Sequence, residues 1–540
     1  MQEFENWSKT FYSDFSTNLQ CMLVHLNKLF RNYFQFILIF IVVLPFKGVA
    51  QLHDQNWIIG SGEPYKNPIP GASGEGIMQF YFGPELSILL DSTIDNSCYT
   101  SFTCACISDK DGRLVAYTDG HNIFDNRHEI MLGGDTINPG NFWAGTLGGS
   151  YPLSDGAIFL PIPGKKSEYI LLHKRIEFGK VEGRLPQYKC DRLYFSSFHY
   201  DDHLGRYVVS EKNNVLIEGE IAENEFAVAK HANGRDYWVV ARRIGRPSYY
   251  FILVDSSGAH LHHEQQVGTA FIFDDLNGNM IFNREENMLA RVIPEEGVEL
   301  MEFDLCKGLF YNPSIQIFPD TFLINGNVAF SPNSRYLYVN SILHIYQYDI
   351  SQRFNRRYKP ILVGSWDSVL IEDTYSTLFF VGRLALDDKI YYTVFGTNGY
   401  YMHTMHRPDA YGKACDFRNH DFRLPNYMNG GLPFFPNFRN ERLSESDCDS
   451  LSQASSMAAG HYYYNTLCRD QIRLSSSDPD KQYQLELRLY NMEGKLCYHR
   501  DFTLQEEINF NLAGVLPGIY ILQLFEGGQL KNIDKIVVSY

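Results

Sequence analysis

The feature that most constrains the fold is a short pattern that recurs along the chain: an apolar run, a polar turn and a second apolar run. Within the runs, apolar and polar residues alternate with a period of two, which is typical of β-strands. The turns carry Gly, Asn and Asp, which tolerate the positive φ of tight hairpins. The copies span residues 105–120, 157–173, 192–210, 226–242, 280–293, 327–341 and 383–396.

The spacing of the copies predicts the architecture. From Gly112 in the first copy to Asp388 in the seventh, the mean interval is about 46 residues. Repeats of roughly 40–50 residues with several strands each are typical of β-propeller blades, whereas a sandwich has turns every ~8–12 residues without the longer period. We therefore predict an all-β chain in which residues 51–442 form a β-propeller. We expect seven blades. The number would be six if two copies belong to one blade, and eight if one blade has too weak a pattern to be detected.

The N-terminal segment has the order of parts found in a secretory signal peptide. Basic residues precede an apolar run at 34–46, and small residues follow up to Ala50. The run is shorter than the ~20 residues that span a bilayer, so we expect residues 1–50 to be removed, leaving Gln51 first. An uncleaved membrane anchor is the alternative, and Met22 is a possible true start.

The cysteines fit an exported protein. Export to an oxidising compartment favours disulfides, and the odd number of cysteines beyond the leader leaves at least one thiol unpaired. Their pairing cannot be read from spacing. We interpret Cys104 and Cys106, two positions apart on one strand, as structural or disulfide cysteines rather than a metal pair. The nine residues are Cys98, Cys104, Cys106, Cys190, Cys306, Cys415, Cys448, Cys468 and Cys497.

The charge balance and the missing motifs narrow the function. The formal net charge is −16, and no basic stripe is present to displace counterions from nucleic acid, so no nucleic-acid partner is expected. The sequence lacks a G-x-S-x-G elbow, a phosphate-binding loop and an H-E-x-x-H helix. We expect no cofactor. A glycosidase with two carboxylates that converge in space stays open, because sequence cannot show such convergence.

The chain changes character after residue 442. Residues 443–469 are rich in small polar side chains and are predicted to be a Ser-rich linker. Strand patterns return in residues 470–540, where Leu485, Leu487 and Leu489 alternate with polar residues and Gly527 opens a hairpin turn. We predict a small C-terminal β-sandwich.

The tail resembles a known export signal. The stretches "LRLYNMEGKLCYHRDF" and "FNLAGVLPGIYILQLFEGGQLKNIDKIVV" resemble the C-terminal sorting domain of the type IX secretion system. The resemblance implies the type IX machinery as a partner and a secreted or cell-surface protein, on the extracellular side of the outer membrane, with surface association possible. The residues that match the family pattern are Leu516, Gly518, Tyr520, Lys535 and Val537.

The middle of the chain resembles exported propeller proteins that carry such tails. The stretch "FSPNSRYLYV" is also similar to the blade signature of WD-like propellers. This resemblance implies a fold and not a ligand, because propellers host binding, scaffolding and catalysis alike.

Two turns supply the candidate ligand-binding residues. His121 and Asn122 lie in "TDGHN", and His231 and Asn233 lie in "KHANG". Because propeller loops line the mouth of the central channel, these side chains are candidates for contact with a ligand. The competing interpretation is that each stretch is a hairpin turn whose Asn and Asp bind their own backbone.

Other polar clusters are weaker candidates for metals. His260, His262 and Glu264 fall on one face of a predicted strand and offer zinc ligands, but strand histidines without further ligands usually face solvent. Residues 109–112 and 274–279 have the oxygen donors of calcium loops without the full spacing. We interpret both as turns and predict no metal site.

Together these features predict an exported binding or adhesion propeller whose ligand is a surface glycan, a surface polymer or a protein. The alternative is an extracellular enzyme that cleaves a polysaccharide or a peptide at the propeller mouth. A purely structural spacer in the surface layer is the third possibility.

Overall fold

The computed structural model describes the following parts of the 540-residue chain: 51–61, 76–91, 99–100, 102–145, 151–179, 188–270, 279–293, 296–319, 326–355, 357–371, 375–395, 399–428, 430–441, 448, 462–464, 467–468, 471–476, 482–491, 494–505, 507–512, 514–516 and 518–538. The expected leader and its cleavage site after Ala50 therefore lie outside the described residues, apart from Gln51.

Two antiparallel sheets come first along the chain. Their strand orders are β3-β2-β1-β4 and β5-β6-β7. The elements are β1 (Asn56–Ser61), β2 (Ile77–Phe82), β3 (Leu86–Asp91), β4 (Tyr99–Thr100), β5 (Ala105–Ser108), β6 (Leu114–Thr118) and β7 (Ile123–Asp125), followed by helix α2 (Asn141–Gly145).

A seven-stranded antiparallel sheet follows, with the order β14-β13-β12-β11-β10-β9-β8. The long central strand β11 is shared by two halves of this sheet. The first half contains β8 to β10, and the second half contains β12 to β14. The strands are β8 (Ala157–Pro161), β9 (Glu168–Phe178), β10 (Tyr188–Asp201), β11 (Arg206–Lys230), β12 (Tyr237–Arg243), β13 (Ser248–Asp255) and β14 (Gly258–Gln266).

Three four-stranded meanders complete this region, each with its strands in sequence order. They consist of β15 (Met280–Phe282), β16 (Met288–Ile293), β17 (Gly297–Asp304) and β18 (Leu309–Ile317); β19 (Asn327–Phe330), β20 (Tyr336–Asn340), β21 (His344–Asp349) and β22 (Ile361–Ser365); and β25 (Phe379–Leu384), β26 (Ile390–Val394), β27 (Gly399–Met405) and β28 (Phe417–Met428). The strands β23 (Leu370–Ile371) and β24 (Tyr375–Ser376) lie between the second and third meanders, η1 (Ile350–Gln352) lies between β21 and β22, and η2 (Gly412–Cys415) lies between β27 and β28.

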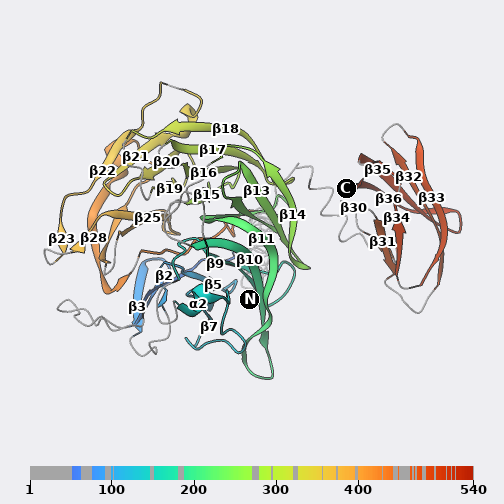
Figure 1. Cartoon of the computed structure of the whole chain (residues 1–540), viewed down its shortest axis with the longest axis horizontal. Helices are drawn as coiled ribbons and strands as arrows, with labels where there is room; N and C mark the ends of the chain where they lie inside the picture. Colours follow the sequence, from blue (N-terminus) through green and yellow to red (C-terminus); the bar gives the residue numbers. More distant parts are fainter. Residues whose placement is uncertain are drawn as a thin grey trace, which may run out of the picture. The chain divides into compact units, whose positions relative to one another are not determined.

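Apolar cores lie between neighbouring sheets, and the series of cores closes on itself. Apart from the two-stranded sheet β23-β24, each sheet from β5 to β28 shares a buried cluster with the next, and the two halves of the seven-stranded sheet share one as well. The β1–β4 sheet packs against β5–β7 on one side and against β25–β28 on the other. The sheets therefore surround a common centre, the arrangement of a β-propeller (Figure 1).

The turn chemistry agrees with the sequence pattern. All seven predicted copies form hairpins, because alternating runs pair once the turn adopts positive φ. Gly112, Gly234 and Asp388 have φ values of 84°, 71° and 63°. Three copies, at 157–173, 192–210 and 226–242, fall in the same seven-stranded sheet, and the β1–β4 sheet has no copy of the pattern.

The C-terminal region forms two packed sheets, as predicted. One has the order β29-β31-β34 and the other β30-β36-β35-β32-β33, with one buried apolar core between them. Leu485, Leu487 and Leu489 all point into this core. The strands are β29 (Tyr462–Tyr464), β30 (Leu467–Cys468), β31 (Gln471–Ser476), β32 (Tyr483–Asn491), β33 (Leu496–Leu504), β34 (Glu507–Asn511), β35 (Gly518–Glu526) and β36 (Gln529–Val538).

Strand pairing in this region begins before residue 470. The two short strands β29 and β30 lie in the segment predicted to be a linker, and they pair with β31 and β36. In the described part of the chain, no helix has the length and apolar character needed to cross a membrane.

Candidate binding site

A segment of eleven residues, Gly430–Asn440, crosses the region enclosed by the sheets; we call it the strap. Its two prolines, Pro433 and Pro436, lack an N–H and hold φ near −65°, which favours an extended path without strand pairing. Leu432 packs with β1, β2 and β25–β28, whereas Phe438 packs with the seven-stranded sheet. The strap therefore joins sheets that lie far apart along the chain.

Polar contacts fasten the C-terminal half of the strap. The backbone N–H of Asn437 donates to Glu286 Oε1 at 2.7 Å, and Asn440 Nδ2 donates to Glu286 Oε2 at 2.8 Å. Lys230 Nζ donates to the carbonyl of Phe438 at 3.0 Å. Because these partners lie on the β11–β12 and β15–β16 hairpins, the strap is tied to two sheets at once.

Glu286 is the central acceptor of this arrangement. Its side chain is buried, its two oxygens accept the contacts described above, and Oε2 also accepts the backbone N–H of Lys230 at 2.8 Å. Burial raises the pKa of Glu286 to about 7, although the three N–H donors and the Lys230 charge favour the ionised form. The carboxyl group therefore anchors the strap and has little capacity left for a ligand.

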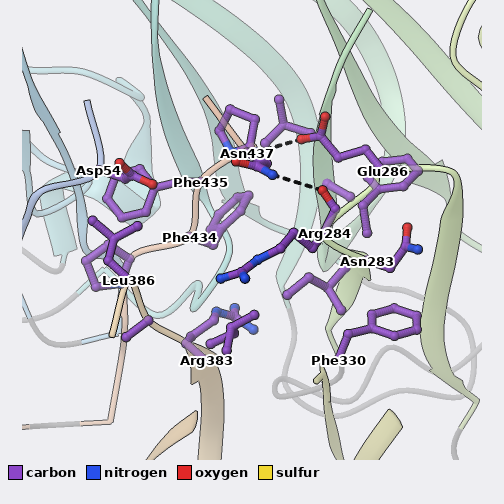
Figure 2. A pocket seen from close by; sticks show the side chains of 18 of the residues that line it. Asp54, Asn283, Arg284, Glu286, Phe330, Arg383, Leu386, Phe434, Phe435 and Asn437 are labelled. Atoms are coloured by element: carbon purple, nitrogen blue, oxygen red, sulfur yellow. Dashed lines mark hydrogen bonds between the residues drawn. The ribbon is translucent and has the colours of Figure 1, made fainter. Parts of the chain in front are cut away.

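A cavity of about 440 Å³ lies beside the strap (Figure 2). This volume is within the range of small-molecule sites. Its walls come from the strap and from the inner strands and turns of several sheets, and they are mainly apolar. The apolar lining residues include Met280, Phe282, Phe330, Leu384, Leu386, Phe434 and Phe435.

The charged groups that line the cavity are already paired. Arg284 pairs with Asp388, which also lines the cavity, and Arg439 pairs with Asp54 at 2.7 Å. Arg383, whose side chain is 3% exposed, pairs with the buried Asp155. Arg284 comes from the β15–β16 turn and Arg383 from β25, and both point into the same cavity (Figure 2).

The first pair of sequence-predicted residues lies in a buried turn. Asp119 Oδ1 accepts the backbone N–H groups of His121 and Asn122 at 2.8 and 2.9 Å. The His121 ring is 3% exposed and lies against Trp143 and Tyr151. Burial lowers the pKa of His121 to about 4, so the ring is neutral at neutral pH.

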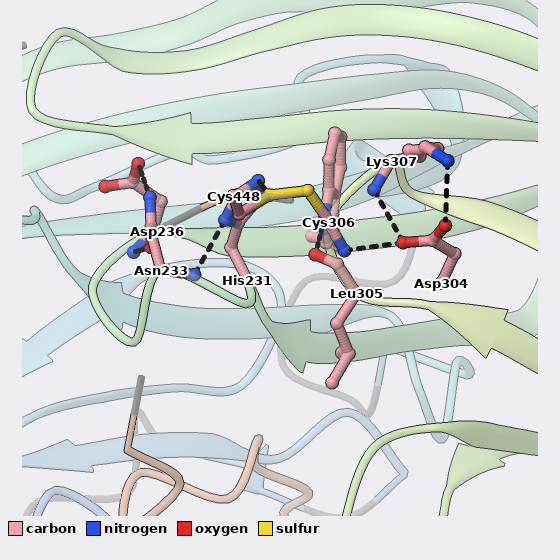
Figure 3. Close-up of a disulfide and its surroundings, with 9 residues drawn as sticks. His231, Asn233, Asp236, Asp304, Leu305, Cys306, Lys307 and Cys448 are labelled. Carbon is pink, nitrogen blue, oxygen red and sulfur yellow. Dashed lines mark hydrogen bonds and ion pairs between the residues drawn. A yellow bond between two sulfur atoms is a disulfide. The ribbon is translucent and has the colours of Figure 1, made fainter. Parts of the chain in front are cut away.

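The second pair lies in the β11–β12 turn, next to a disulfide (Figure 3). Asn233 Oδ1 accepts the N–H groups of Arg235 and Asp236, and its Nδ2 donates to Asp236 Oδ2 at 2.7 Å. His231 Nδ1 accepts the N–H of Asn233 at 3.1 Å, and burial lowers its pKa.

The residues around the cavity differ from the predicted candidates. His121, Asn122, His231 and Asn233 are not among the residues that line it, and their role in ligand binding stays a prediction. Sequence reasoning did not single out Arg284 and Arg383, although both lie in copies of the hairpin pattern. A charged side chain in or next to an apolar hairpin was the one available signal.

The disulfide joins Cys306 and Cys448, with a Cα–Cα distance of 5.5 Å and a sequence separation of 142. It connects the β17–β18 turn to the chain that follows the strap. Among the described cysteines, Cys104, Cys106, Cys190 and Cys415 are buried and form no disulfide, and Cys497 is exposed and forms none either. Burial raises the pKa of Cys106 to about 12, which disfavours the thiolate that a metal would need.

The groups considered for metals have other partners. Glu264 lies beside Arg243 at 3.5 Å, and His262 Nδ1 lies 2.8 Å from His263 Nδ1. Asp109 Oδ1 accepts the N–H groups of Asp111 and Arg113, as expected for a turn. Of the residues 274–279, only Asn279 is described, and it pairs with the backbone of Val328.

The tail is where comparison with known proteins is decisive. Residues 468–539 match the secretion system C-terminal sorting domain. The chain carries a type IX sorting tail. It is therefore secreted or displayed at the cell surface and interacts with the type IX secretion machinery.

The predicted sorting residues lie on or next to the last two strands of the tail. Leu516 is exposed, and its carbonyl accepts the hydroxyl of the buried Tyr520 at 2.7 Å. Gly518 begins β35, and Lys535 and Val537 lie in β36.

Solved structures similar to this chain include a putative 6-phosphogluconolactonase from Bacteroides uniformis, with 12% identity, 70% of this chain and 99% of the other covered, and a TM-score of 0.39. Hsv2p of Kluyveromyces lactis shares 11% identity over 66% of this chain and 90% of its own, with a TM-score of 0.32. The β-propeller domain of Cps50 from Myceliophteria thermophila shares 10% identity over 62% of this chain and 94% of its own, with a TM-score of 0.30. At these TM-scores, the similarities support no conclusion about the function of this chain. No curated protein matches the sequence.

Proposed function

We propose that this protein is an exported binding protein that holds its ligand in the cavity beside the strap. The single observation that carries the proposal is that the carboxylates lining this cavity are already bound within the chain. Asp54 pairs with Arg439, Asp388 pairs with Arg284, and Glu286 accepts three N–H donors. The apolar walls remain available, as in most small-ligand sites.

The proposal includes a blade count. We infer seven blades, because the seven-stranded sheet divides at β11 into two units and each unit has its own apolar core with the adjacent sheet. The other blades are β1–β4, β5–β7, β15–β18, β19–β22 and β25–β28.

An extracellular hydrolase is the rival function. Hydrolysis by a carboxylate pair needs one acid that donates a proton to the substrate and one base or nucleophile that reaches it. Glu286 has the raised pKa of a general acid, but its oxygens face the strap donors. Asp388 is 60% exposed and is the one lining carboxylate accessible enough to act on a substrate.

The test uses the full exported chain and a panel of apolar peptides, apolar acids and oligosaccharides, with calorimetry for binding and chromatography for turnover. Leu386→Trp, which fills part of the cavity, should abolish binding of the active probe. The matched control, Leu204→Trp, changes an exposed leucine in the β10–β11 turn and should leave binding intact. Product formation by the wild type that is lost in Asp388→Asn would show that the protein is a hydrolase and not a binding protein.

A further inference from the structure

The cavity walls suit an apolar body better than a sugar. Phe282, Phe330, Leu386 and Phe434 offer carbon surface and no hydrogen bonds. The polar group of Asn283 is used within its own turn: its Oδ1 accepts the N–H of Met288 at 2.9 Å, and its Nδ2 donates to Asn287 at 2.8 Å. A saccharide would leave several hydroxyl groups without partners here, and burying unpaired polar groups is costly.

Asn437, the other amide in the lining, is also occupied. Its Nδ2 donates to the carbonyl of Arg284 at 3.0 Å and to Asn440 Oδ1 at 2.8 Å, and its Oδ1 accepts the N–H of Arg439 at 3.1 Å. With both amides occupied, the polar side chains that remain for a ligand are those of the ion pairs, and the guanidinium groups are the hydrogen-bond donors among them.

Arg383 has hydrogen-bonding capacity left. The side chain is almost fully buried and pairs with Asp155, but its Nε–H has no acceptor within the described part of the chain. Its guanidinium carbon lies 5.8 Å from the centre of the Phe434 ring, so an aromatic wall of the cavity lies beside a cation. A buried N–H donor without a partner is unfavourable, and an acceptor on a ligand would relieve this cost.

Arg284 can exchange its partner. It is 36% exposed and pairs with Asp388, which is 60% exposed. Exposed ion pairs contribute little, because solvent screens both charges. A ligand carboxylate that enters with its apolar body already buried can therefore replace Asp388 on Arg284, and planar guanidinium groups bind carboxylates in two-point geometry.

We infer that the ligand is an apolar carboxylate, with its anionic end at Arg284 and Arg383 and its apolar body among Phe330, Leu386 and Phe434. The inference rests on the binding function proposed above and names the ligand class. Such a group occurs at the C-terminus of an apolar peptide and in a free medium-chain acid, and the two sources share the same chemistry.

The experiment measures affinity of the full chain for four probes by calorimetry: acetyl-Leu-Phe with a free carboxylate, the same peptide as its C-terminal amide, decanoate, and a tri-galacturonate. The free acid of the peptide, decanoate or both should bind at least ten times more tightly than the amide. Which of the two acids binds better identifies the source.

Three variants sharpen the result. Arg284→Gln should lower affinity for the acid about tenfold, and Asp388→Asn, which removes the competing carboxylate, should raise it severalfold; neither should alter binding of the amide. The control is Arg418→Gln, which removes an exposed arginine at β28 that pairs with Asp416, and it should change nothing.

Two results would overturn the inference while leaving the proposed function in place: equal binding of acid and amide that Leu386→Trp still blocks, or binding of tri-galacturonate in preference to the apolar acids. Absence of any binding that depends on Leu386 would instead remove the proposed function itself.

Discussion

Arg439 binds Asp54 through two hydrogen bonds, of 2.7 and 3.0 Å, although 385 residues separate the two in the sequence. Asp54 lies two residues before the start of β1 in the first sheet, and Arg439 lies in the strap that follows β28. β1 and β2 also contact β28, and Asn426 Nδ2 donates to the carbonyl of Gly76 at 2.7 Å. The ion pair thus secures the closure of the ring at the point where the strap passes the cavity.

We expect Asp54→Asn to destabilise the protein by about 2 kcal/mol, because it leaves a partly buried arginine without its counter-charge. The measurement is urea unfolding of the full chain. Lys110→Gln, which breaks an ion pair between two exposed residues, is the control and should change the free energy by less than about 0.5 kcal/mol. Equal effects of the two substitutions would show that the strap pair does not stabilise the ring.

Glu286 should make stability depend on pH. Its folded pKa of about 7 lies above the ordinary 4.5, so its contribution is fully present below 4.5 and is lost as pH rises through 7. Relative to Glu286→Gln, which does not titrate, the wild type should lose about 2–3 kcal/mol of unfolding free energy between pH 5 and pH 8. A difference that stays constant over this range would contradict the buried state of the carboxyl group.

The disulfide should stabilise the chain mainly by restricting the unfolded state. It closes a loop with a sequence separation of 142, so the double variant Cys306→Ser, Cys448→Ser should lose about 2–4 kcal/mol. Thermal unfolding with and without reductant provides the measurement, and reductant should have no further effect on the variant. Cys497→Ser, at an exposed free thiol, is the matched control and should behave like the wild type.

A variant of His121 tests whether ligand binding depends on the turn predicted from the sequence or on the cavity beside the strap. Because its ring is buried against Trp143 and Tyr151, His121→Ala should lower stability by about 1–3 kcal/mol and leave ligand affinity unchanged. Thermal unfolding and calorimetry on the same samples measure the two effects. Weaker binding in a variant of unchanged stability would support the ligand role predicted from "TDGHN".

The sorting tail should be needed for export and dispensable for the propeller. A chain that lacks residues 470–540 should retain the cooperative unfolding of the ring and accumulate in the periplasm. Cell fractionation followed by thermal unfolding of the periplasmic protein gives both readouts. Appearance of the shortened chain outside the cell would argue against the role of the tail.

The sequence alone determined the local β-structure and the destination of the protein. Period-two alternation and turn residues are properties of neighbouring positions, so each hairpin from "ACISDKDGRLVAYTDG" to "RLALDDKIYYTVFG" was predictable. The first sheet was missed because β1, β2 and β3 are joined without a copy of that pattern. The tail was recognisable from its resemblance to the sorting family, and residues 468–539 match that domain.

Tertiary structure decided the candidate site. Arg284 and Asp388 are 104 residues apart, and Arg383 and Asp155 are 228 apart. No local pattern encodes such pairs, because they form only when the ring closes and brings turns of different sheets to one centre. Packing against Trp143 and Tyr151 buries His121, and only the tertiary structure brings Cys448 to Cys306. Sequence periodicity specifies the sheets, whereas the packing of sheet against sheet specifies which side chains meet.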